Sequence, residues 1–530
     1  MYGYSTHENR ETPVTPAPEL AGRSVKARSR TADMHVAGES DGCVVPVKGP
    51  NNGGSDVPVA APAEDLEGRH PVTENTGQSV PAPDAAPDRS GSRGLLGVRE
   101  AARRDKRMRF TALLHHVTVE QLRTSFYALK REAAPGVDGV TWRAYGADLD
   151  ERLAALHAAV HRGTYRAQPS KRAYILKADG RQRPLGIAAL EDKIVQHAVG
   201  VVLTQIYEAD FLGFSYGSRP GRSQHMALDA LTVGLVRKRV NWVLDADIRG
   251  FFDHIDHEWM QRFLGHRIAD RRVLRLIQKW LTAGVSEDGM WSRTEVGTPQ
   301  GAVISPLLAN VYLHYVFDLW VEHWRRHQAT GDVIVIRYVD DIVMGFEHRR
   351  DAERCLAAWR ERLGQFGLEL NPDKTRLLEF GRYAASNRKR RGAGKPETFD
   401  FLGFTHICGK TRAAGKFVVQ RKTIRKRLRA KLQKVKAELH RRWHEPVPAV
   451  GQWLQRVVQG YFNYHAVPGN WESLDRFRTQ VIWLWYRTLR RRGQRHRMTW
   501  RRFARLCSMW FPPIRILHPY PSDRFDARHS

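Results

Sequence analysis

Apolar and β-branched residues dominate positions 333–346, and two adjacent carboxylates interrupt them. The run Val333-Ile-Val-Ile-Arg-Tyr-Val-Asp-Asp-Ile-Val-Met-Gly-Phe346 predicts two short strands joined by a tight turn at Asp340 and Asp341. A second apolar stretch, at 243–247, predicts another strand that ends in Asp247. If the two segments are neighbours in one sheet, Asp247 can face Asp340 and form an oxygen-rich site with it.

A helical pattern replaces the strand pattern towards the end of the chain. Apolar residues recur there at helical spacing, and most positions between them are Arg or Lys: Ile424, Leu428, Leu432, Val435 and Leu439. Positions 453–464 also show the periodicity of an amphipathic helix. From 421 to 530 there are 26 Lys+Arg, 6 Asp+Glu and 16 aromatic residues. A basic, aromatic-rich region of this kind favours contacts with nucleic-acid phosphates and bases.

The composition of the whole chain agrees with a polyanion partner. Its 530 residues include 86 Lys+Arg and 56 Asp+Glu, for a net charge of +30, and 42% of residues are hydrophobic. That apolar content excludes wholesale disorder. No apolar run approaches the roughly 18 residues of a membrane span, and four widely separated cysteines indicate neither a disulfide framework nor a CxxC zinc site. We expect a cytoplasmic protein that binds nucleic acid and no membrane.

The first 95 residues differ from the rest. They hold 9 Lys+Arg, 13 Asp+Glu and 11 of the 26 prolines, with only two aromatic residues. Such a segment buries too little apolar surface to offset its ordering entropy. We predict a disordered, acidic leader over 1–95, and we assign it no function.

The carboxylates identified from the strand pattern are costly among apolar residues unless cations neutralise them. Mg²⁺ suits oxygen-rich sites of this kind, with one or two carboxylates each and with water and substrate phosphates as the remaining ligands. Two such ions, about 3.5–4 Å apart, would support phosphoryl transfer, and Mn²⁺ is a possible substitute. Asp245 and Asp253 remain alternatives to Asp247, because Asp245 and Asp247 share one face of their strand.

The motif Tyr338-Val-Asp-Asp341 resembles the signature of reverse transcriptases, and its surroundings resemble bacterial group II intron-encoded proteins. Further blocks similar to that family follow its order over roughly 105–405. These blocks are Ala134-Pro-Gly-Val-Asp-Gly-Val-Thr141, Lys177-Ala-Asp-Gly-Arg-Gln-Arg-Pro-Leu-Gly-Ile187, Phe214-Ser-Tyr-Gly-Ser-Arg-Pro-Gly221, Gly297-Thr-Pro-Gln-Gly-Ala-Val-Ile-Ser-Pro-Leu-Leu-Ala-Asn310, Gly367-Leu-Glu-Leu-Asn-Pro-Asp-Lys-Thr375 and Phe399-Asp-Phe-Leu-Gly-Phe404.

The resemblance implies a catalytic and metal-binding triad of Asp247, Asp340 and Asp341. It selects Asp247 from the alternatives left open above. Asp253 and Asp256 are then expected to make structural hydrogen bonds.

The same resemblance implies four nucleotide-binding residues. Lys177 and Arg183 match the residues that grip the triphosphate of the incoming nucleotide, and a point cation and a planar fork suit that task. Gln300 matches a residue that lines the nucleotide pocket. Phe252 matches the aromatic residue under the sugar, where a bulky ring excludes a 2′-hydroxyl and favours dNTPs.

Downstream, the basic helix near 421–442 corresponds to a thumb, and 453–464 resembles the family's maturase block. We expect the RNA-binding residues of this region to be Arg425, Lys426, Arg429, Lys434, Tyr461 and Tyr464. Many relatives also carry an HNH endonuclease with paired cysteines. Here Cys507 is the only cysteine after Cys408, so we expect none.

We therefore expect an α+β fold of the right-hand polymerase type: fingers and an antiparallel palm sheet over 96–410, then a helical thumb and maturase region over 411–530. The resemblance implies an RNA-directed DNA polymerase that copies intron RNA and promotes its splicing and mobility. Its partners would be group II intron RNA, an RNA template with a DNA primer, dNTPs and target DNA, in the bacterial nucleoid or a ribonucleoprotein. The alternatives are a splicing-only maturase and another bacterial reverse transcriptase, serving defence or diversity generation.

Overall fold

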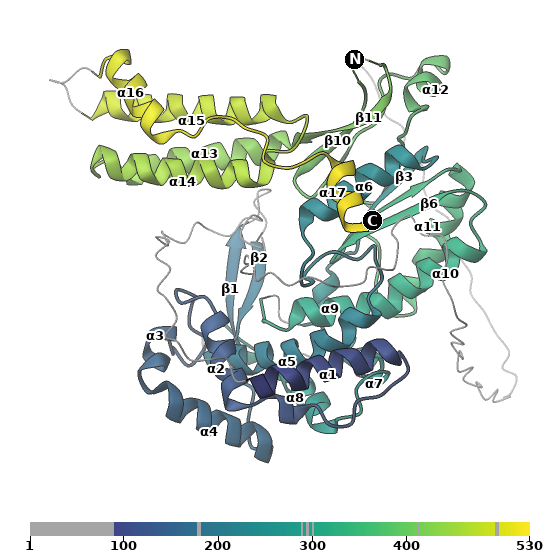
Figure 1. Ribbon diagram of the computed structural model, residues 1–530, viewed down its shortest axis with the longest axis vertical. Coiled ribbons are helices and arrows are strands. Elements are labelled where there is room, and N and C mark those ends of the chain that lie inside the picture. Colours follow the sequence, from purple (N-terminus) through teal and green to yellow (C-terminus); the bar gives the residue numbers. More distant parts are fainter. Residues whose placement is uncertain are drawn as a thin grey trace, which may run out of the picture. The chain divides into compact units, whose positions relative to one another are not determined.

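The computed structural model describes residues 89–176, 182–287, 290–292, 296–298, 301–411, 414–492 and 498–529. These residues combine helices with three separate sheets in a mixed α+β fold (Figure 1). Most of the predicted disordered leader, up to residue 88, lies outside the described residues. Its last part is helical, because α1 begins at Arg89 and ends at Arg104, and Leu95 packs against the core. The leader prediction was wrong for 89–95.

The central sheet contains both acidic segments predicted from the sequence. Its strand order is β6-β7-β3-β8, with every neighbouring pair antiparallel. The strands are β3 (Trp242–Asp247), β6 (Val333–Tyr338), β7 (Asp341–Phe346) and β8 (Arg376–Glu379). Val343, Met344 and Leu244 are fully buried between helices, which explains the nearly continuous apolar runs in these strands.

Two smaller sheets complete the β structure. One has the order β2-β1-β4-β5 and the other β11-β10-β9. Their strands are β1 (Ser170–Leu176), β2 (Gln182–Ile187), β4 (Val285–Glu287), β5 (Met290–Ser292), β9 (Phe399–Phe401), β10 (Phe404–Lys410) and β11 (Phe417–Thr423).

Most helices before residue 400 share one apolar core with the central sheet. Helix α8 shows how the sequence forms such an element: the Asp270 side chain caps its first turn, and Val273, Ile277 and Trp280 lie buried on one face. The helices are α2 (Val119–Ala128), α3 (Trp142–Tyr145), α4 (Leu149–Arg162), α5 (Leu190–Asp210), α6 (Gln224–Arg237), α7 (His257–Gly265), α8 (Arg271–Thr282), α9 (Ser305–Leu313), α10 (Leu319–His327), α11 (Arg349–Gly364) and α12 (Ala384–Arg390). Short 3₁₀ turns occupy η2 (Leu114–His116), η3 (Gly146–Asp148) and η4 (Phe251–Asp253), and η5 (His314–Asp318) is a π-helical turn.

Four helices after residue 424 form a second core. Helices α13, α14 and α15 lie side by side, and α16 follows them (Figure 1). Their bounds are α13 (Arg425–Arg441), α14 (Val447–His465), α15 (Trp471–Arg491) and α16 (Trp500–Trp510). Leu454, Phe477 and Trp485 are completely buried among them. We call α13 to α16 the helical region.

The final helix, α17 (Pro521–His529), returns to the outer face of α6. Phe525 is buried there, and Arg237 donates two hydrogen bonds to Asp526, at 2.8 and 2.6 Å. Arg524 also pairs with the buried Asp229 of α6, 3.3 Å between the charged atoms. The last described residues therefore belong to the layer that covers the central sheet.

Among the described residues, no helix combines the length and apolar character needed to cross a membrane.

Candidate active site

The central sheet brings the three predicted catalytic carboxylates to one end. In the antiparallel pair of β3 and β7, Asp247 is directly opposite Asp341. Directly opposed residues project their side chains to the same face of a sheet, so the two carboxylates are neighbours. Asp340 precedes Asp341 in the turn that joins β6 to β7. Segments 94 residues apart in sequence, from 247 to 341, thus meet at a single point.

The turn itself differs slightly from the sequence prediction. Tyr338 pairs with Asp341, so the two-residue turn is Val339 and Asp340, and Asp341 already belongs to β7. Val339 has a φ of 56°. Two-residue hairpin turns require positive φ, which Gly and Asn adopt readily and a β-branched residue does not. The surrounding structure must therefore hold Val339 in a strained conformation.

Two further side chains contact the carboxylate of Asp247. Lys374 Nζ donates to Asp247 Oδ2 at 2.8 Å, and Asn371 Nδ2 donates to the same oxygen at 3.3 Å. The backbone amide of Asn371 also donates to the carbonyl of Asp247, at 2.8 Å. Both residues belong to the 367–375 block, whose sequence alone predicts no role for them. Only the structure shows that this loop contacts β3.

Asp245, one of the two alternatives to Asp247, and Asp256, for which a structural role was predicted, both have partners away from Asp247. Asp245 forms an ion pair with Arg376, at 3.0 Å, and burial raises its pKa. Asp256 caps α7 by accepting a hydrogen bond from the amide of Trp259, at 2.8 Å. The structural role predicted for Asp256 is confirmed.

The donor chemistry of this end of the sheet fits Mg²⁺. Its candidate ligands are carboxylate oxygens, which Mg²⁺ and Mn²⁺ prefer. Within the described ranges, no three Asp, Glu, His or Cys side chains converge closely enough to enclose a metal by themselves. An ion held by one or two carboxylates with water and phosphate oxygens is consistent with that finding.

The loop that begins at Gly297 packs against the turn that follows Asp247. The amide of Thr298 donates to the carbonyl of Phe252, at 2.8 Å. Gly297 has a φ of 93°, and a Cβ on it would lie 3.0 Å from that same carbonyl oxygen. Gly301 has a φ of 112°, and a Cβ on it would lie 2.9 Å from the carbonyl oxygen of Gly186 in β2. Glycine at both positions therefore allows this loop to join the β1–β2 hairpin to the turn that carries Phe252.

Of the four predicted nucleotide-binding residues, only Phe252 has a described side chain. Phe252 lies in η4, packs partly buried against the main core, and meets Phe251 edge to face with ring centroids 5.3 Å apart. Lys177 and Gln300 lie outside the described residues. Arg183 pairs with Ile175 in the β1–β2 hairpin, but its side chain is not among those described. The loop thus contacts both the hairpin and the turn of Phe252, while the roles of all four residues stay predictions.

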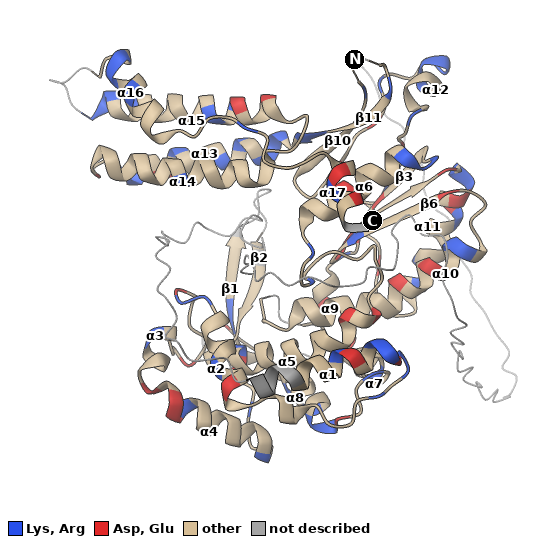
Figure 2. Cartoon of the chain, viewed as in Figure 1, with Lys and Arg blue, Asp and Glu red and all other residues tan. Residues whose placement is uncertain are grey.

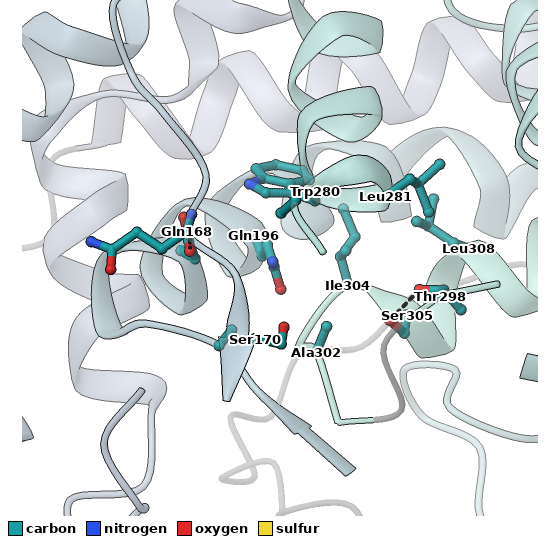
Figure 3. A pocket seen from close by; sticks show the side chains of 13 residues that line it. Gln168, Ser170, Gln196, Trp280, Leu281, Thr298, Ala302, Ile304, Ser305 and Leu308 are labelled. Atoms are coloured by element: carbon teal, nitrogen blue, oxygen red, sulfur yellow. Dashed lines mark hydrogen bonds between the residues drawn. The ribbon is translucent and has the colours of Figure 1, made fainter. Parts of the chain in front are cut away.

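Behind the loop lies a small cavity of about 10 Å³, enough for about one water molecule. Figure 3 shows its walls, where the hydroxyl oxygens of Thr298 and Ser305 are 2.7 Å apart in a hydrogen bond. Gln196 of α5 accepts a hydrogen bond from the amide of Val303, at 3.0 Å. Asp192 also lines the cavity, and burial raises its pKa to about 6. Helix α5 is thus hydrogen-bonded to the end of the loop through Gln196.

The four cations predicted to bind RNA lie on the exposed side of α13. Arg425, Lys426, Arg429 and Lys434 are all exposed on α13, opposite its buried apolar stripe. Figure 2 shows Lys and Arg gathered on α13 and on α16.

Tyr461 and Tyr464 are buried, contrary to their predicted contact with RNA. Tyr461 is 5% exposed and stacks on Phe477, with ring centroids 3.7 Å apart. Tyr464 is 8% exposed and donates its hydroxyl to the carbonyl of Leu402, at 2.8 Å. Neither ring offers a face to a base, so both predictions are corrected. Helical periodicity locates a residue on a face, but it does not say whether that face is covered.

Other aromatic residues of the helical region are exposed. Trp483 and Trp500 are 46% and 53% exposed, and each contacts Tyr486. The three ring centroids lie 5.3 to 6.0 Å apart, and the Arg490 guanidinium lies over Tyr486. We call Trp483, Tyr486 and Trp500 the aromatic platform. Sequence reasoning overlooked it, although 476–522 contains twelve Arg, no Lys and no acidic residue.

Comparison with known proteins agrees with this geometry. Residues 175–406 match the family model of the reverse transcriptase (RNA-dependent DNA polymerase), a range that contains all three carboxylates and the loop at Gly297. The chain therefore contains a reverse transcriptase domain.

Individual relatives indicate which kind of reverse transcriptase this chain resembles. The chain is 35% identical over 279 residues to Protein YkfC of Escherichia coli (strain K12). The aligned stretch covers 46% of this chain and 72% of that protein. It is 41% identical over 166 residues to the Group II intron-encoded protein LtrA of Lactococcus lactis subsp. cremoris, over 31% of this chain and 27% of LtrA. Nuclear intron maturase 1, mitochondrial, of Arabidopsis thaliana is 29% identical over 91 residues, 17% of this chain and 12% of that protein. The chain belongs to the reverse transcriptases of the group II intron type, although its match spans only about a quarter of LtrA.

Proposed function

We propose that this chain is an RNA-directed DNA polymerase that copies intron RNA into cDNA and also binds group II intron RNA to promote its splicing and mobility. The observation that carries the polymerase proposal is the register that sets Asp247 opposite Asp341, beside the turn that contains Asp340. In this proposal the central sheet is the palm, the β1–β2 hairpin belongs to the fingers, and α13 is the thumb.

The three carboxylates would hold two Mg²⁺ ions, and the chemistry that these ions would supply is Lewis-acid stabilisation of charge on the attacking and leaving oxygens. Lys177 and Arg183 would bind the triphosphate, Gln300 would line the pocket, and Phe252 would exclude the 2′-hydroxyl of an rNTP. Contact between the Gly297 loop and the turn at Phe252 supports this arrangement, because it brings the backbone that precedes Gln300 beside Phe252.

RNA binding is proposed for the helical region. Exposed cations on α13 would contact phosphates, and the aromatic platform would stack on unpaired bases. Arg is suited to the surface around the platform, because its planar guanidinium forms bidentate bonds with phosphate and also stacks on rings. The absence of acidic residues from 476 to 522 removes local repulsion of the RNA backbone.

The polymerase proposal is tested by primer extension. The full chain, a DNA primer annealed to an RNA template, dNTPs and Mg²⁺ should yield cDNA. Failure to extend under conditions where the protein still accelerates splicing would favour the splicing-only alternative.

The maturase proposal is tested with a group II intron RNA at Mg²⁺ concentrations too low for unassisted splicing. The protein should accelerate splicing, and Trp483→Ala with Trp500→Ala should weaken RNA binding by about tenfold or more, since base stacking contributes about 1–3 kcal/mol per base. Exposed Met509→Ala on α16 is a matched control, because it removes apolar surface outside the platform. Equal loss from the control would contradict the stacking assignment.

A further inference from the structure

Directly behind the Val339–Asp340 turn lies a cluster of buried polar side chains. Arg337, Asp318 and Asn310 are each 0% exposed. Arg337 donates to both carboxylate oxygens of Asp318, Nε to Oδ1 at 2.7 Å and Nη2 to Oδ2 at 2.6 Å. Two charges this deeply buried are expensive to desolvate, and such pairs contribute little net stability. The pair is better explained by the hydrogen bonds that the third nitrogen of the Arg337 guanidinium donates.

That donor is Nη1 of Arg337, which points to the turn. It donates to Asn310 Oδ1 at 2.8 Å and to the carbonyl oxygen of Val339 at 3.2 Å. Asn310 in turn donates from Nδ2 to the carbonyl of Gly217, at 2.8 Å. The ion pair with Asp318 fixes the guanidinium, so the other two bonds of Arg337 have a defined direction.

Gly217 holds the opposite side of the turn. A Cβ at Gly217 would lie 2.5 Å from both the amide nitrogen and Cγ2 of Val339, so its backbone is in close contact with the strained residue. The segment before it is bonded to β6, because the Arg337 amide donates to the Phe214 carbonyl and the Tyr216 amide donates to the Arg337 carbonyl, both at 2.9 Å. The block at 214–221 therefore supports the turn from outside the central sheet.

We propose that Arg337, Asn310 and Gly217 are positioning residues that keep Val339 at positive φ and thereby fix Asp340 for metal binding. The proposal rests on the proposed function, because it concerns the same metal-binding carboxylates. A β-branched residue left to itself relaxes to negative φ, and this relaxation moves the adjacent Asp340. The network opposes that relaxation because Arg337 binds the carbonyl of Val339 and Gly217 packs against its amide.

The main test uses Asn310→Ala, which leaves the Arg337–Asp318 pair intact. Metal affinity is measured on the full chain by Mn²⁺ titration with electron paramagnetic resonance, and separately as the Mg²⁺ concentration for half-maximal primer extension. We expect about a tenfold loss of metal affinity, the size of effect that one lost buried hydrogen bond produces. Gly217→Ala should act in the same direction, because its Cβ pushes on the turn.

Rescue separates positioning from general structural support. Val339→Gly adopts positive φ without strain, so adding it to Asn310→Ala should recover at least half of the lost metal affinity on a logarithmic scale. Ser218→Gly is the matched control, because Ser218 also has positive φ, 52°, but lies outside the turn. It should not rescue the affinity.

The outcomes are distinct. A lower unfolding midpoint with unchanged metal affinity in Asn310→Ala, or equal rescue by both glycine variants, overturns the positioning proposal. Absence of both Mn²⁺ binding and extension in the wild-type chain overturns the proposed polymerase function. Wild-type Mn²⁺ binding that Asn310→Ala weakens and Val339→Gly restores supports the positioning proposal independently of polymerase activity.

Discussion

The central sheet buries a charged side chain in an ion pair, whereas α13 of the helical region exposes cations. Arg337 and Asp318 are completely buried behind the Val339–Asp340 turn and form a bidentate pair. In α13, Arg425 and Lys426 are exposed above an apolar stripe. A buried pair has one allowed geometry and therefore fixes atoms, whereas exposed cations attract a polyanion from a distance without fixing its pose. In the proposed function, the buried pair places the chemistry and the exposed cations capture the RNA, so the two tasks are separated within one chain.

The strongest way to break the comparison is to remove the chemistry alone. Asp340→Asn with Asp341→Asn should reduce primer extension on the order of 10³-fold or more, because metal ligation is worth several kcal/mol in the transition state. RNA affinity, measured by filter binding, should change less than twofold. A parallel loss of RNA binding would show that the two regions are not separable.

Neutralising the cations of α13 should have the converse effect. Changing four exposed residues to Gln, Arg425, Lys426, Arg429 and Lys434, should weaken RNA binding on the order of 10²-fold at moderate salt. It should also lower the slope of log affinity against log salt by about 3, since each single-strand phosphate contact contributes about 0.7.

A charge-matched control uses four exposed cations elsewhere, all changed to Gln: Arg350, Arg360, Lys389 and Lys395. These should leave the salt slope nearly unchanged. Equal effects of the two sets would mean that net charge, and not the surface of α13, attracts the RNA.

The next effect concerns the sugar. Phe252→Ala should raise the kcat/KM for rNTP relative to dNTP by about tenfold, which is the discrimination typical of steric pockets. Single-nucleotide extension with matched dNTP and rNTP measures the ratio, and dNTP incorporation serves as the internal control. An unchanged ratio removes Phe252 from sugar selection and leaves it as a core residue of η4.

The smallest expected effect concerns the free energy of unfolding, to which His225 and Asp192 contribute with opposite pH dependence. Burial, and next the adjacent His518, lower the pKa of His225 to about 3. The unfolded chain therefore binds the extra proton first, and the folded state loses stability as pH falls from 6.5 towards 3, by about 1 kcal/mol per pH unit. Urea unfolding of His225→Gln between pH 7 and 5 should show a flatter pH dependence.

Asp192 beneath the Gly297 loop has the opposite sign. Its pKa is raised to about 6, so the stability it contributes at low pH is lost as pH rises through 6. Asp192→Asn should therefore lose more stability than the wild type on acidification from pH 7 to 5. Identical pH slopes in Asp192→Asn and His225→Gln would contradict both assignments.

The sequence predicted the strands and helices that depend on local pattern. The strands of 333–346 and the strand ending at Asp247 are where the β-branched runs placed them, and α14 contains the predicted helical stretch at 453–464. The predicted basic helix near 421–442 begins only at Arg425 of α13, because 421–423 belong to strand β11. The register between β3 and β7 could not be derived from pattern alone, and the family resemblance supplied the pairing of Asp247 with the turn.

Long-range polar contacts could not be predicted in this way. Arg337 occupies an apolar strand, and nothing local indicates that its partners are Asp318 and Asn310. The positive φ of Val339 contradicts local propensity, and Gly217, which packs against this residue, lies far from it in the sequence. Tyr464 was misassigned for a related reason, since the cover over its face comes from Leu402 and its neighbours, about 60 residues away.

Helix α17 can cover α6 only late in translation, because it is made long after α6. Arg237 and Asp526 are 289 positions apart, so at about 5–20 residues per second the ribosome needs roughly 15–60 s between them. Throughout that interval the outer face of α6 lacks the apolar cover that Phe525 later provides. Nascent chains stalled in the helical region should consequently recruit holdase chaperones at α6, and release of the last turns should end that association.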